Sequence, residues 1–167
     1  MSADKATIEI RRAQASDIPA LGRLGAMLVE EHHDFDPLRF IAPSPETPER
    51  YGGFLGSQLK KRDIIVLVAT SGEKVVGYTY AGVEGYDYMS LRGPAGVLYD
   101  IVVDPQQRRQ GIGRRLIEAT LNALQEAGAP RVVLSTAAKN EAAQHLFQSA
   151  GFRRTMIEMT RELETDT

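Results

Sequence analysis

The sequence contains no cysteine, no long apolar run and no excess of charge of one sign. Without cysteine the chain can form neither a disulfide framework nor a thiolate zinc site, and it has no cysteine nucleophile. No apolar run approaches the roughly 20 residues that a membrane-spanning helix requires. The first residues also lack the apolar region of a signal peptide. We therefore expect a cytoplasmic protein that does not bind a membrane.

The charge balance and the length narrow the class of protein further. A formal net charge of −2 gives no basic surface, so we expect no nucleic-acid partner. The 167 residues, of which 43% are hydrophobic, suffice for one domain with a full core. We predict a single domain at residues 7–163, with tails at 1–6 and 164–167.

Hydrophobic periodicity and turn residues predict an α/β protein with the element order β-α-α-β-β-β-α-β-α-β. The pattern indicates a mixed sheet covered by helices. A continuous apolar, β-branched run at 64–70 is typical of a strand that is buried on both faces. The predicted strands are at 7–12, 64–70, 75–84, 96–103, 131–137 and 152–163, and the predicted helices at 16–31, 48–61, 111–127 and a short segment that Asn140 caps.

Residues 95–116 form the stretch with the clearest functional pattern. An apolar strand turns at Asp104-Pro105, passes through several basic residues and enters a helix at Gly111 and Gly113. Unpaired backbone N–H groups at a helix N-terminus, next to positive side chains, favour an anion such as a pyrophosphate.

Gly111 and Gly113 could also belong to a different kind of loop. A dinucleotide-binding fingerprint starting at Gly111 would need glycine or alanine at position 116, where the chain has Leu116. A phosphate-binding P-loop would need Gly-Lys followed by serine or threonine, which the chain lacks. The remaining alternative is that the glycines only permit a tight turn.

Two motifs in this order resemble those of the GCN5-related N-acetyltransferase (GNAT) family, over about residues 7–163. The family's phosphate-binding signature, Arg/Gln-x-x-Gly-x-Gly/Ala, matches residues 108–113. Its second signature, Asn-x-x-Ala followed by an aromatic residue and Gly-Phe, matches residues 140–152. The resemblance implies a central, mostly antiparallel sheet in which one pair of strands splays apart.

The resemblance also implies acetyl-CoA as the acyl donor. The family's phosphate-binding residues correspond here to Arg108, Arg109, Gln110, Gly111, Ile112, Gly113 and Arg114. Free amides of the strand at Ile101, Val102 and Val103 would bind the pantetheine arm and polarise the thioester carbonyl. Asn140 would face the same arm. Preorganised N–H donors accelerate acyl transfer because they stabilise the oxygen on which negative charge develops.

Phe147 departs from the pattern of the family. Many members have a tyrosine at this position, placed to protonate the departing CoA thiolate. A phenyl ring next to the donor can contribute to binding but cannot donate a proton. Water or another hydroxyl must then do so, or the thiolate leaves unprotonated, because a free thiol has a pKa of about 8.5.

Direct attack requires a neutral amine, so a general base or a water relay must remove its proton. Asp100 is the first candidate, because a carboxylate inside an apolar run is rarely there for packing; the alternative is that Asp100 bonds a neighbouring loop or helix end. Strand alternation predicts that at most one of Tyr99 and Asp100 faces the thioester. Tyr99 is a candidate proton donor, and Glu84 and Tyr80 are reserve candidates for the base.

The segment at 30–36 is acidic and contains His32 and His33. Adjacent histidines rarely coordinate one ion in zinc geometry, so we expect no metal. Negative charge from Glu30, Glu31, Asp34 and Asp36 would favour a cationic amine acceptor, although a solvated acidic surface explains it equally well.

The sequence therefore predicts an acetyl-CoA-dependent N-acetyltransferase that acts on a primary amine of a small molecule or peptide by direct attack in a ternary complex. The alternative is a non-catalytic acyl-CoA-binding module with the same fold, which Phe147 favours. The sequence leaves the acceptor open, and also the oligomeric state, a homodimer included.

Overall fold

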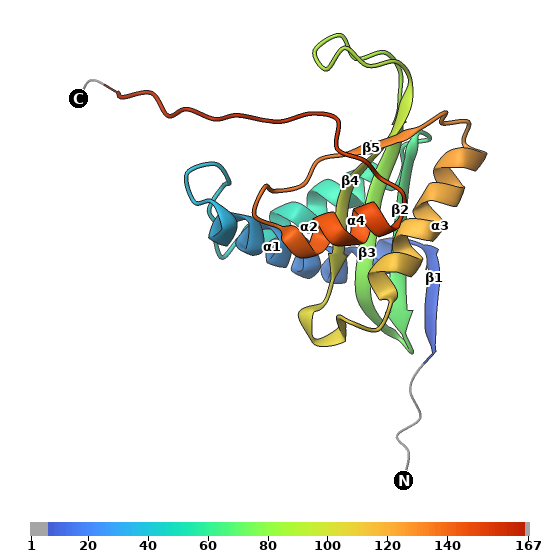
Figure 1. Ribbon diagram of the computed structural model, residues 1–167. Helices are drawn as coiled ribbons and strands as arrows, with labels where there is room; N and C mark the ends of the chain where they lie inside the picture. The colour runs from blue at the N-terminus through green and yellow to red at the C-terminus, as the bar shows by residue number, and fades with distance from the viewer. Residues whose placement is uncertain (1–6, 166–167) are drawn as a thin grey trace.

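The computed structural model describes residues 7–165 and contains a five-stranded mixed sheet in the order β1-β2-β3-β4-β5 (Figure 1). The pairs from β1 to β4 are antiparallel, and β4 pairs with β5 in parallel. This confirms the predicted mixed, mostly antiparallel sheet. The strands are β1 (Ile8–Arg12), β2 (Ile64–Ser71), β3 (Lys74–Glu84), β4 (Ala95–Val103) and β5 (Val132–Leu134), and the helices are α1 (Ile18–Phe35), α2 (Thr47–Gln58), α3 (Ile112–Glu126) and α4 (Glu141–Ser149).

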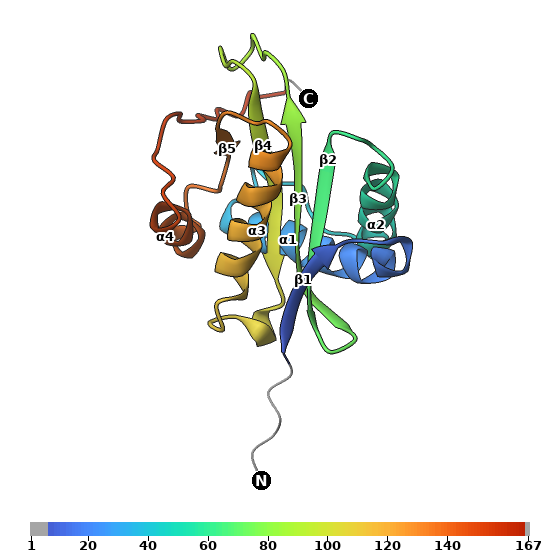
Figure 2. The same cartoon turned by 90° about the vertical axis from the view of Figure 1, so that its right-hand side faces the viewer.

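Helices cover both faces of the sheet, α1 and α2 on one and α3 and α4 on the other (Figure 2). Successive residues of β2 point to opposite layers, because side chains alternate along a strand. Val66 and Val68 pack with Leu21 of α1, whereas Ile65 and Leu67 belong to the cluster that holds α3. The prediction that β2 is buried on both faces is therefore confirmed.

Strand β4 contains an irregularity that changes which face its side chains reach. Tyr80 pairs with Asp100 but Ala81 pairs with Leu98, so Tyr99 is an extra residue in the register. Such a bulge shifts the alternation by one residue. Leu98 packs in the α3 layer, while Val102, an even number of residues later, packs in the α1 layer.

The pair β4–β5 splays apart after a short contact, as predicted. Only residues 96–98 of β4 pair with residues 132–134 of β5. Beyond Leu98, β4 continues to Val103 with β3 as its partner on one side. The predicted strand at 131–137 is shorter than expected because β5 diverges from β4 after Leu134.

The predicted last strand at 152–163 is the main error of the sequence analysis. Residues 152–165 are extended but pair with no strand among the described residues, and they lead away from the sheet (Figure 1). Alternating side chains give the segment the character of a strand, but a strand also needs an edge to pair with. The predicted tails at 1–6 and 164–167 lie outside the described residues, except for residues 164 and 165.

Asp17, directly before α1, joins the start of this helix to β1. Its side chain accepts two hydrogen bonds from Arg11, at 2.7 and 2.9 Å, and one from the backbone N–H of Gln14, at 2.8 Å. The Arg11 guanidinium holds the pKa of the Asp17 carboxyl below its usual range.

Among residues 7–165, no helix combines the length and apolar character that crossing a bilayer requires.

Candidate active site

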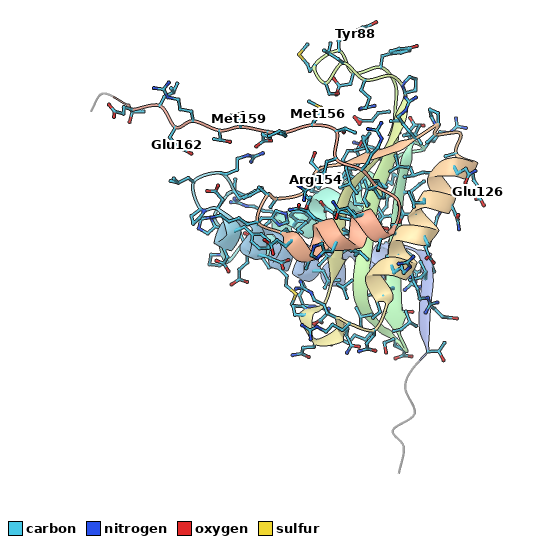
Figure 3. The ribbon with its side chains drawn as sticks, viewed as in Figure 1. Tyr88, Glu126, Arg154, Met156, Met159 and Glu162 are labelled. Atoms are coloured by element: carbon cyan, nitrogen blue, oxygen red, sulfur yellow. The ribbon has the colours of Figure 1, made fainter. Side chains whose placement is uncertain are left out.

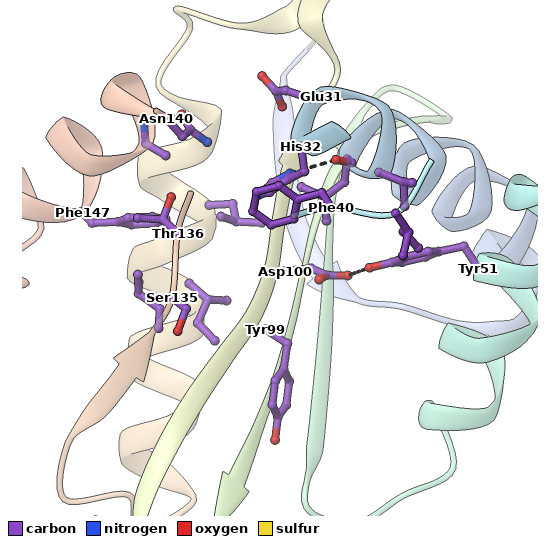
Figure 4. Close-up of a pocket in the computed structure, with 17 residues that line it drawn as sticks. Glu31, His32, Phe40, Tyr51, Tyr99, Asp100, Ser135, Thr136, Asn140 and Phe147 are labelled. Carbon is purple, nitrogen blue, oxygen red and sulfur yellow. Dashed lines mark hydrogen bonds between the residues drawn. The ribbon is translucent and has the colours of Figure 1, made fainter. Parts of the chain in front are cut away.

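A cavity of about 340 Å³ opens where β4 and β5 separate. Both walls of the splayed pair contribute to it, together with the end of α1, the loop that follows it, α2 and α4 (Figure 4). The residues that line it include Glu31, His32, Phe40, Tyr51, Leu98, Tyr99, Asp100, Ile101, Ser135, Thr136, Asn140 and Phe147.

The unpaired part of β4 directs backbone donors towards this cavity. The N–H of Asp104 donates to the carbonyl oxygen of Val76 on β3, at 2.8 Å. Because N–H groups alternate between the two sides of a strand, those of Ile101 and Val103 point to the side from which β5 has diverged. The N–H of Val102 points towards β3. Of the three residues predicted at this position, Ile101 and Val103 therefore offer free amides.

The loop between β4 and α3 has a backbone that few residue types can adopt. Gly111, directly before α3, has a φ of +76°, and Arg109 has a φ of +63°. A Cβ added at Gly111 would meet no atom within 4 Å, so the space directly above the loop is open. At Gly113, a Cβ would come within 3.2 Å of Leu146, so this glycine lets α4 approach.

The first turn of α3 presents backbone N–H groups to that open space. The first i to i−4 hydrogen bond at this end joins the N–H of Arg115 to the carbonyl of Gly111, at 3.1 Å. The N–H groups of Ile112, Gly113 and Arg114 precede it and have no partner within the helix. They lie at the positive end of the helix dipole, which suits an anion.

The basic side chains of the loop have partners that the sequence did not indicate. Arg108 lies 3.3 Å from Glu31 of α1 and also donates to the carbonyl of Val103. Arg114 pairs with Glu118 one turn along α3. The ion pair between Arg108 and Glu31 connects the loop between β4 and α3 with the end of α1 at the cavity.

Asp100 is partly buried in the cavity wall. Its Oδ2 accepts hydrogen bonds from the hydroxyls of Tyr51 on α2, at 2.6 Å, and Tyr78 on β3, at 2.9 Å. Burial raises the pKa of the Asp100 carboxyl, and the two hydrogen bonds and the nearby His32 partly offset that rise. A carboxylate with a raised pKa is suited to accept a proton near neutral pH.

Tyr99 and Asp100 both line the cavity, although strand alternation predicted that their side chains point to opposite faces of the sheet. The bulge at Tyr99 is the reason, because it places two successive side chains on the same side of β4. The Tyr99 ring lies against Tyr80, with 4.6 Å between centroids. Burial and the neighbouring Glu84 raise the pKa of Tyr99 to about 12.

The reserve candidates for the base lie elsewhere. Tyr80 donates to Gln58, and Glu84 pairs with Arg92 at 3.2 Å. Neither is among the residues that line the cavity. Asp100, which pairs with Tyr80 across the sheet, is thus the one of these base candidates that lines the cavity.

The second sequence motif forms the start and inner face of α4. Asn140 caps the helix, since its side-chain oxygen accepts from the N–H of Ala143 at 3.1 Å. Phe147 is 6% exposed, lines the cavity and packs against Phe152. Ser135 and Thr136, at the end of β5, place hydroxyl groups in the same wall beside Phe147 (Figure 4).

The predicted acidic segment contributes less than its composition indicated. Of its four carboxylates only Glu31 lines the cavity, and it is paired with Arg108. Asp36 accepts hydrogen bonds from the backbone of Leu38 and Arg39. Within residues 7–165 no three histidine or acidic side chains gather closely enough to hold a metal ion.

Several residues of the cavity were not identified from the sequence. Tyr51 and Tyr78 reach Asp100 across 49 and 22 positions of the chain, and Phe40 enters from a loop. Nothing in their local pattern separates them from core aromatic residues. Ser135 and Thr136 could have been noticed as two hydroxyls directly after a buried strand.

The chain is similar in sequence to known acetyltransferases. The family model described as "Acetyltransferase (GNAT) family" matches residues 26–152. Human N-acetyltransferase 8 is 36% identical over 99 residues, which are 59% of this chain and 43% of that protein. The ribosomal protein bS18 alanine N-acetyltransferase of Escherichia coli is 38% identical over 69 residues, or 41% of this chain and 47% of the relative. The chain thus spans less than half the length of these curated relatives.

Solved structures extend the likeness to nearly the whole chain. An aminoglycoside acetyltransferase from an uncultured soil metagenomic sample, solved with sisomicin, is 25% identical with a TM-score of 0.65, covering 94% of this chain and 97% of its own. A mutant of the BH1408 protein from Bacillus halodurans has a TM-score of 0.80 at 22% identity, covering 93% and 99%. An aminoglycoside N-acetyltransferase in complex with CoA has a TM-score of 0.71 at 16% identity, covering 99% and 100%.

Proposed function

Since this chain belongs to the GNAT family of acetyltransferases, we propose that it is an N-acetyltransferase that uses acetyl-CoA to acetylate a primary amine. The observation that carries the proposal is the splay of β4 from β5 directly beside the N-terminus of α3. Together these features leave backbone N–H groups of β4 and of the first turn of α3 without a partner in the sheet or the helix, which supports the proposal. We assign the activity to a single domain at residues 7–163 of a cytoplasmic protein.

Three features of the chain fit the binding of CoA. The open space above Gly111 leaves room for a pyrophosphate at the first turn of α3. Asn140 caps α4 across the cleft. The amides of Ile101 and Val103 would donate to the pantetheine arm and to a thioester carbonyl. Acetyl-CoA would supply the acetyl group, activated as a thioester. We propose Arg108, Arg109, Gln110 and Arg114, which precede or begin α3, as further donors to the pyrophosphate.

In the proposed reaction, Asp100 accepts the proton of the acceptor amine, directly or through water. Its raised pKa and its position in the cavity wall support this role. Tyr51 and Tyr78 keep the carboxylate oriented, because both hydroxyls donate to the same oxygen. Positioned proton transfer of this kind typically contributes about 10²- to 10⁴-fold to the rate.

The proton for the departing thiolate needs a source other than Phe147. Tyr99 keeps its proton at neutral pH, since its pKa is about 12, and it lines the cavity. The hydroxyls of Ser135 and Thr136 lie in the wall beside Phe147. We propose Tyr99 as the donor, with water as the alternative.

The acceptor would enter between the end of α1 and Asp100. His32, Phe40 and Tyr51 line this part of the cavity, and Glu31 is its acidic side chain. A cationic amine could pair with Glu31 in exchange for Arg108. Named relatives act on amines of this kind, an alanine of a ribosomal protein in one case and aminoglycosides in another.

A non-catalytic acyl-CoA-binding module is the second candidate, and Phe147 is the observation that favours it. The deciding experiment measures release of free CoA from acetyl-CoA with a panel of amines that includes polyamines, aminoglycosides and peptides with free N-termini. We expect turnover with at least one cationic amine. Saturable binding of acetyl-CoA without turnover on any acceptor would favour the binding module, and absence of binding would remove both candidates.

A further inference from the structure

His32, in the last turn of α1, lines the cavity but has no role in the reaction proposed above. Its ring nitrogen Nδ1 lies 2.8 Å from the carbonyl oxygen of Leu28, one helical turn earlier. Because a carbonyl oxygen can only accept a hydrogen bond, Nδ1 carries the hydrogen of the neutral ring. The other ring nitrogen, Nε2, therefore has a free lone pair.

Aromatic contacts hold the imidazole of His32 in this orientation. Phe35 and Phe40 both meet the ring edge to face, with 5.9 and 5.0 Å between centroids. Edge-to-face packing is a favourable arrangement of aromatic rings. Together with the hydrogen bond from Nδ1, these contacts fix the direction of Nε2.

Phe40 is in turn supported from outside the cavity. The guanidinium of Arg39 lies over its ring, 4.9 Å from the centroid, and forms an ion pair with Glu158. Glu158 belongs to the extended segment after α4, on which Figure 3 shows Met156 and Met159. A contact between distant parts of the chain thus supports this wall of the cavity.

Asp100 lines the same cavity with one unused oxygen. The hydroxyls of Tyr51 and Tyr78 both donate to Oδ2, and within residues 7–165 no group donates to Oδ1. The described part of the chain has no fully buried side-chain nitrogen or oxygen without a partner, so Oδ1 of Asp100 and Nε2 of His32 are both accessible to solvent. The charge of His32 is one of the influences that offset the effect of burial on the pKa of Asp100, which indicates that the two side chains lie close together (Figure 4).

Acetylation of an amine removes two protons from one nitrogen. A primary amine enters as an ammonium group with three N–H bonds, and the amide product keeps one of them. Asp100 takes the first proton in the reaction proposed above, and its Oδ1 is then no longer free to accept another. Attack on the thioester carbon leaves the nitrogen with a positive charge and two hydrogens, so a second acceptor is needed.

We propose that Nε2 of His32 is this second proton acceptor, an inference that rests on the proposed N-acetyltransferase activity. After the amine has attacked, its N–H bond breaks and an Nε2–H bond forms, so that His32 becomes an imidazolium ion. The C–S bond then breaks, and its electron pair leaves with the sulfur of CoA. Of the two protons taken from the nitrogen, one balances the proton that the thiolate takes up, and the other is released to solvent.

The tautomer of His32 can be measured without any substrate. The sequence contains three histidines, so proton–nitrogen NMR spectra of the imidazoles can be assigned by comparing wild type with His32→Asn. At a pH where the ring is neutral, we expect hydrogen on Nδ1 of His32 and none on Nε2. Hydrogen on Nε2 instead would leave no acceptor in the cavity and would overturn the proposal.

His32→Asn also tests the role in turnover, because asparagine keeps an N–H donor for Leu28 but has no lone pair in place of Nε2. His33→Asn is the matched control, since Nδ1 of His33 lies 3.1 Å from the carbonyl oxygen of Phe40 and His33 does not line the cavity. We expect His32→Asn to lower kcat about a hundredfold and to leave KM for acetyl-CoA unchanged. His33→Asn should keep kcat within about twofold of wild type. Equal decreases in both variants would mean that His32 is a structural residue.

Chemical rescue of His32→Ala separates proton transfer from packing. Added imidazole should raise kcat of this variant about tenfold, whereas pyrazole, a ring of the same shape but a much weaker base, should not. Equal rescue by the two rings, or none by either, would contradict the proposal. Turnover by wild type with an unimpaired His32→Asn would remove the role of His32 alone, whereas a wild type that acetylates no amine would remove the proposed function as well.

Discussion

The proposed donor side and acceptor side of the site are built in different ways. The donor side, residues 101–113, is one continuous piece of chain whose chemistry lies in its backbone: free strand amides, a left-handed Gly111 and the first turn of α3. The acceptor side consists of side chains from α1, α2, β3 and β4 that converge on Asp100. In the proposed reaction, backbone groups would bind what every acyl-CoA donor shares, whereas side chains would select and deprotonate an acceptor.

This difference predicts where substitutions act. A change on the donor side should affect binding of CoA, because a backbone site is lost when its shape changes. A change on the acceptor side should leave CoA binding intact and affect the rate or its pH dependence. Each of the following substitutions tests one side while the other serves as its reference.

Gly111→Trp should have the largest effect, a loss of CoA affinity of about a thousandfold. The residue needs a φ of +76°, which strains any other side chain, and an indole would fill the open space above the loop. Losing several hydrogen bonds to a charged group, each worth about 1.5–3 kcal/mol, accounts for that magnitude. Isothermal titration calorimetry with CoA provides the measurement.

Gly72→Trp is the matched control for this change. Gly72, in the turn between β2 and β3, has a φ of +61°, and a Cβ added there would also meet no atom within 4 Å, but the residue lies away from the cavity. The substitution should cost similar stability and leave CoA affinity within about twofold of wild type. Equal affinity losses in both variants would mean that the donor side is not the phosphate site.

Asp100→Asn should lower kcat by about a hundredfold, within the range expected for removal of a general base. CoA affinity should stay unchanged, because the substitution keeps the volume and the acceptor oxygen for Tyr51 and Tyr78. The acid limb of the pH–rate profile should flatten as well. Full activity in this variant would make Asp100 a structural residue that joins α2 to β3.

The same variant should be more stable than wild type at neutral pH. The folded-state pKa of Asp100 is raised by burial, so its stabilising contribution is present at low pH and is lost as the pH rises through that pKa. Asparagine does not ionise and avoids this loss. We therefore expect a higher Tm for Asp100→Asn at pH 7, and a difference that narrows towards pH 4, by calorimetry at both pH values.

The strand, loop and helix start at residues 101–113 could be predicted from the sequence because their determinants are local. Two patterns can be interpreted without knowledge of distant contacts: glycines at fixed spacing after a strand, and Asn140 before a short helix. The family resemblance and the mixed sheet followed from these motifs and from periodicity. The boundaries of most elements were close to those predicted, since the β-branched runs and glycine stops mark them locally.

The acceptor side and the last strand could not be predicted because they depend on long-range geometry. The contacts of Asp100 with Tyr51 and Tyr78 arise only when α2 packs on β3. The bulge at Tyr99 reverses the alternation that the sequence analysis assumed. The segment at 152–163 has the pattern of a strand, but a pattern does not specify which edge, or which molecule, supplies the partner.

Tyr51→Phe should have a smaller effect on the acceptor side, a decrease in kcat of less than about fivefold. Loss of one hydrogen bond to the ionised carboxylate removes an influence that lowers the pKa of Asp100, so that pKa rises. Because the base is active when ionised, the acid limb of kcat/KM against pH should move to higher pH. Tyr86→Phe, at an exposed tyrosine, should leave the profile unchanged.

Phe147→Tyr, a substitution next to the proposed donor side, should have the smallest effect. If a thiolate with a pKa of about 8.5 can leave unprotonated, or with a proton from Tyr99 or water, an added hydroxyl contributes little. We expect kcat to change by less than about threefold and CoA affinity to stay the same, since the ring remains packed against Phe152. An increase in kcat of more than tenfold would instead mean that the native cavity lacks an effective proton donor. Asp100 would then act as a base without a matching acid.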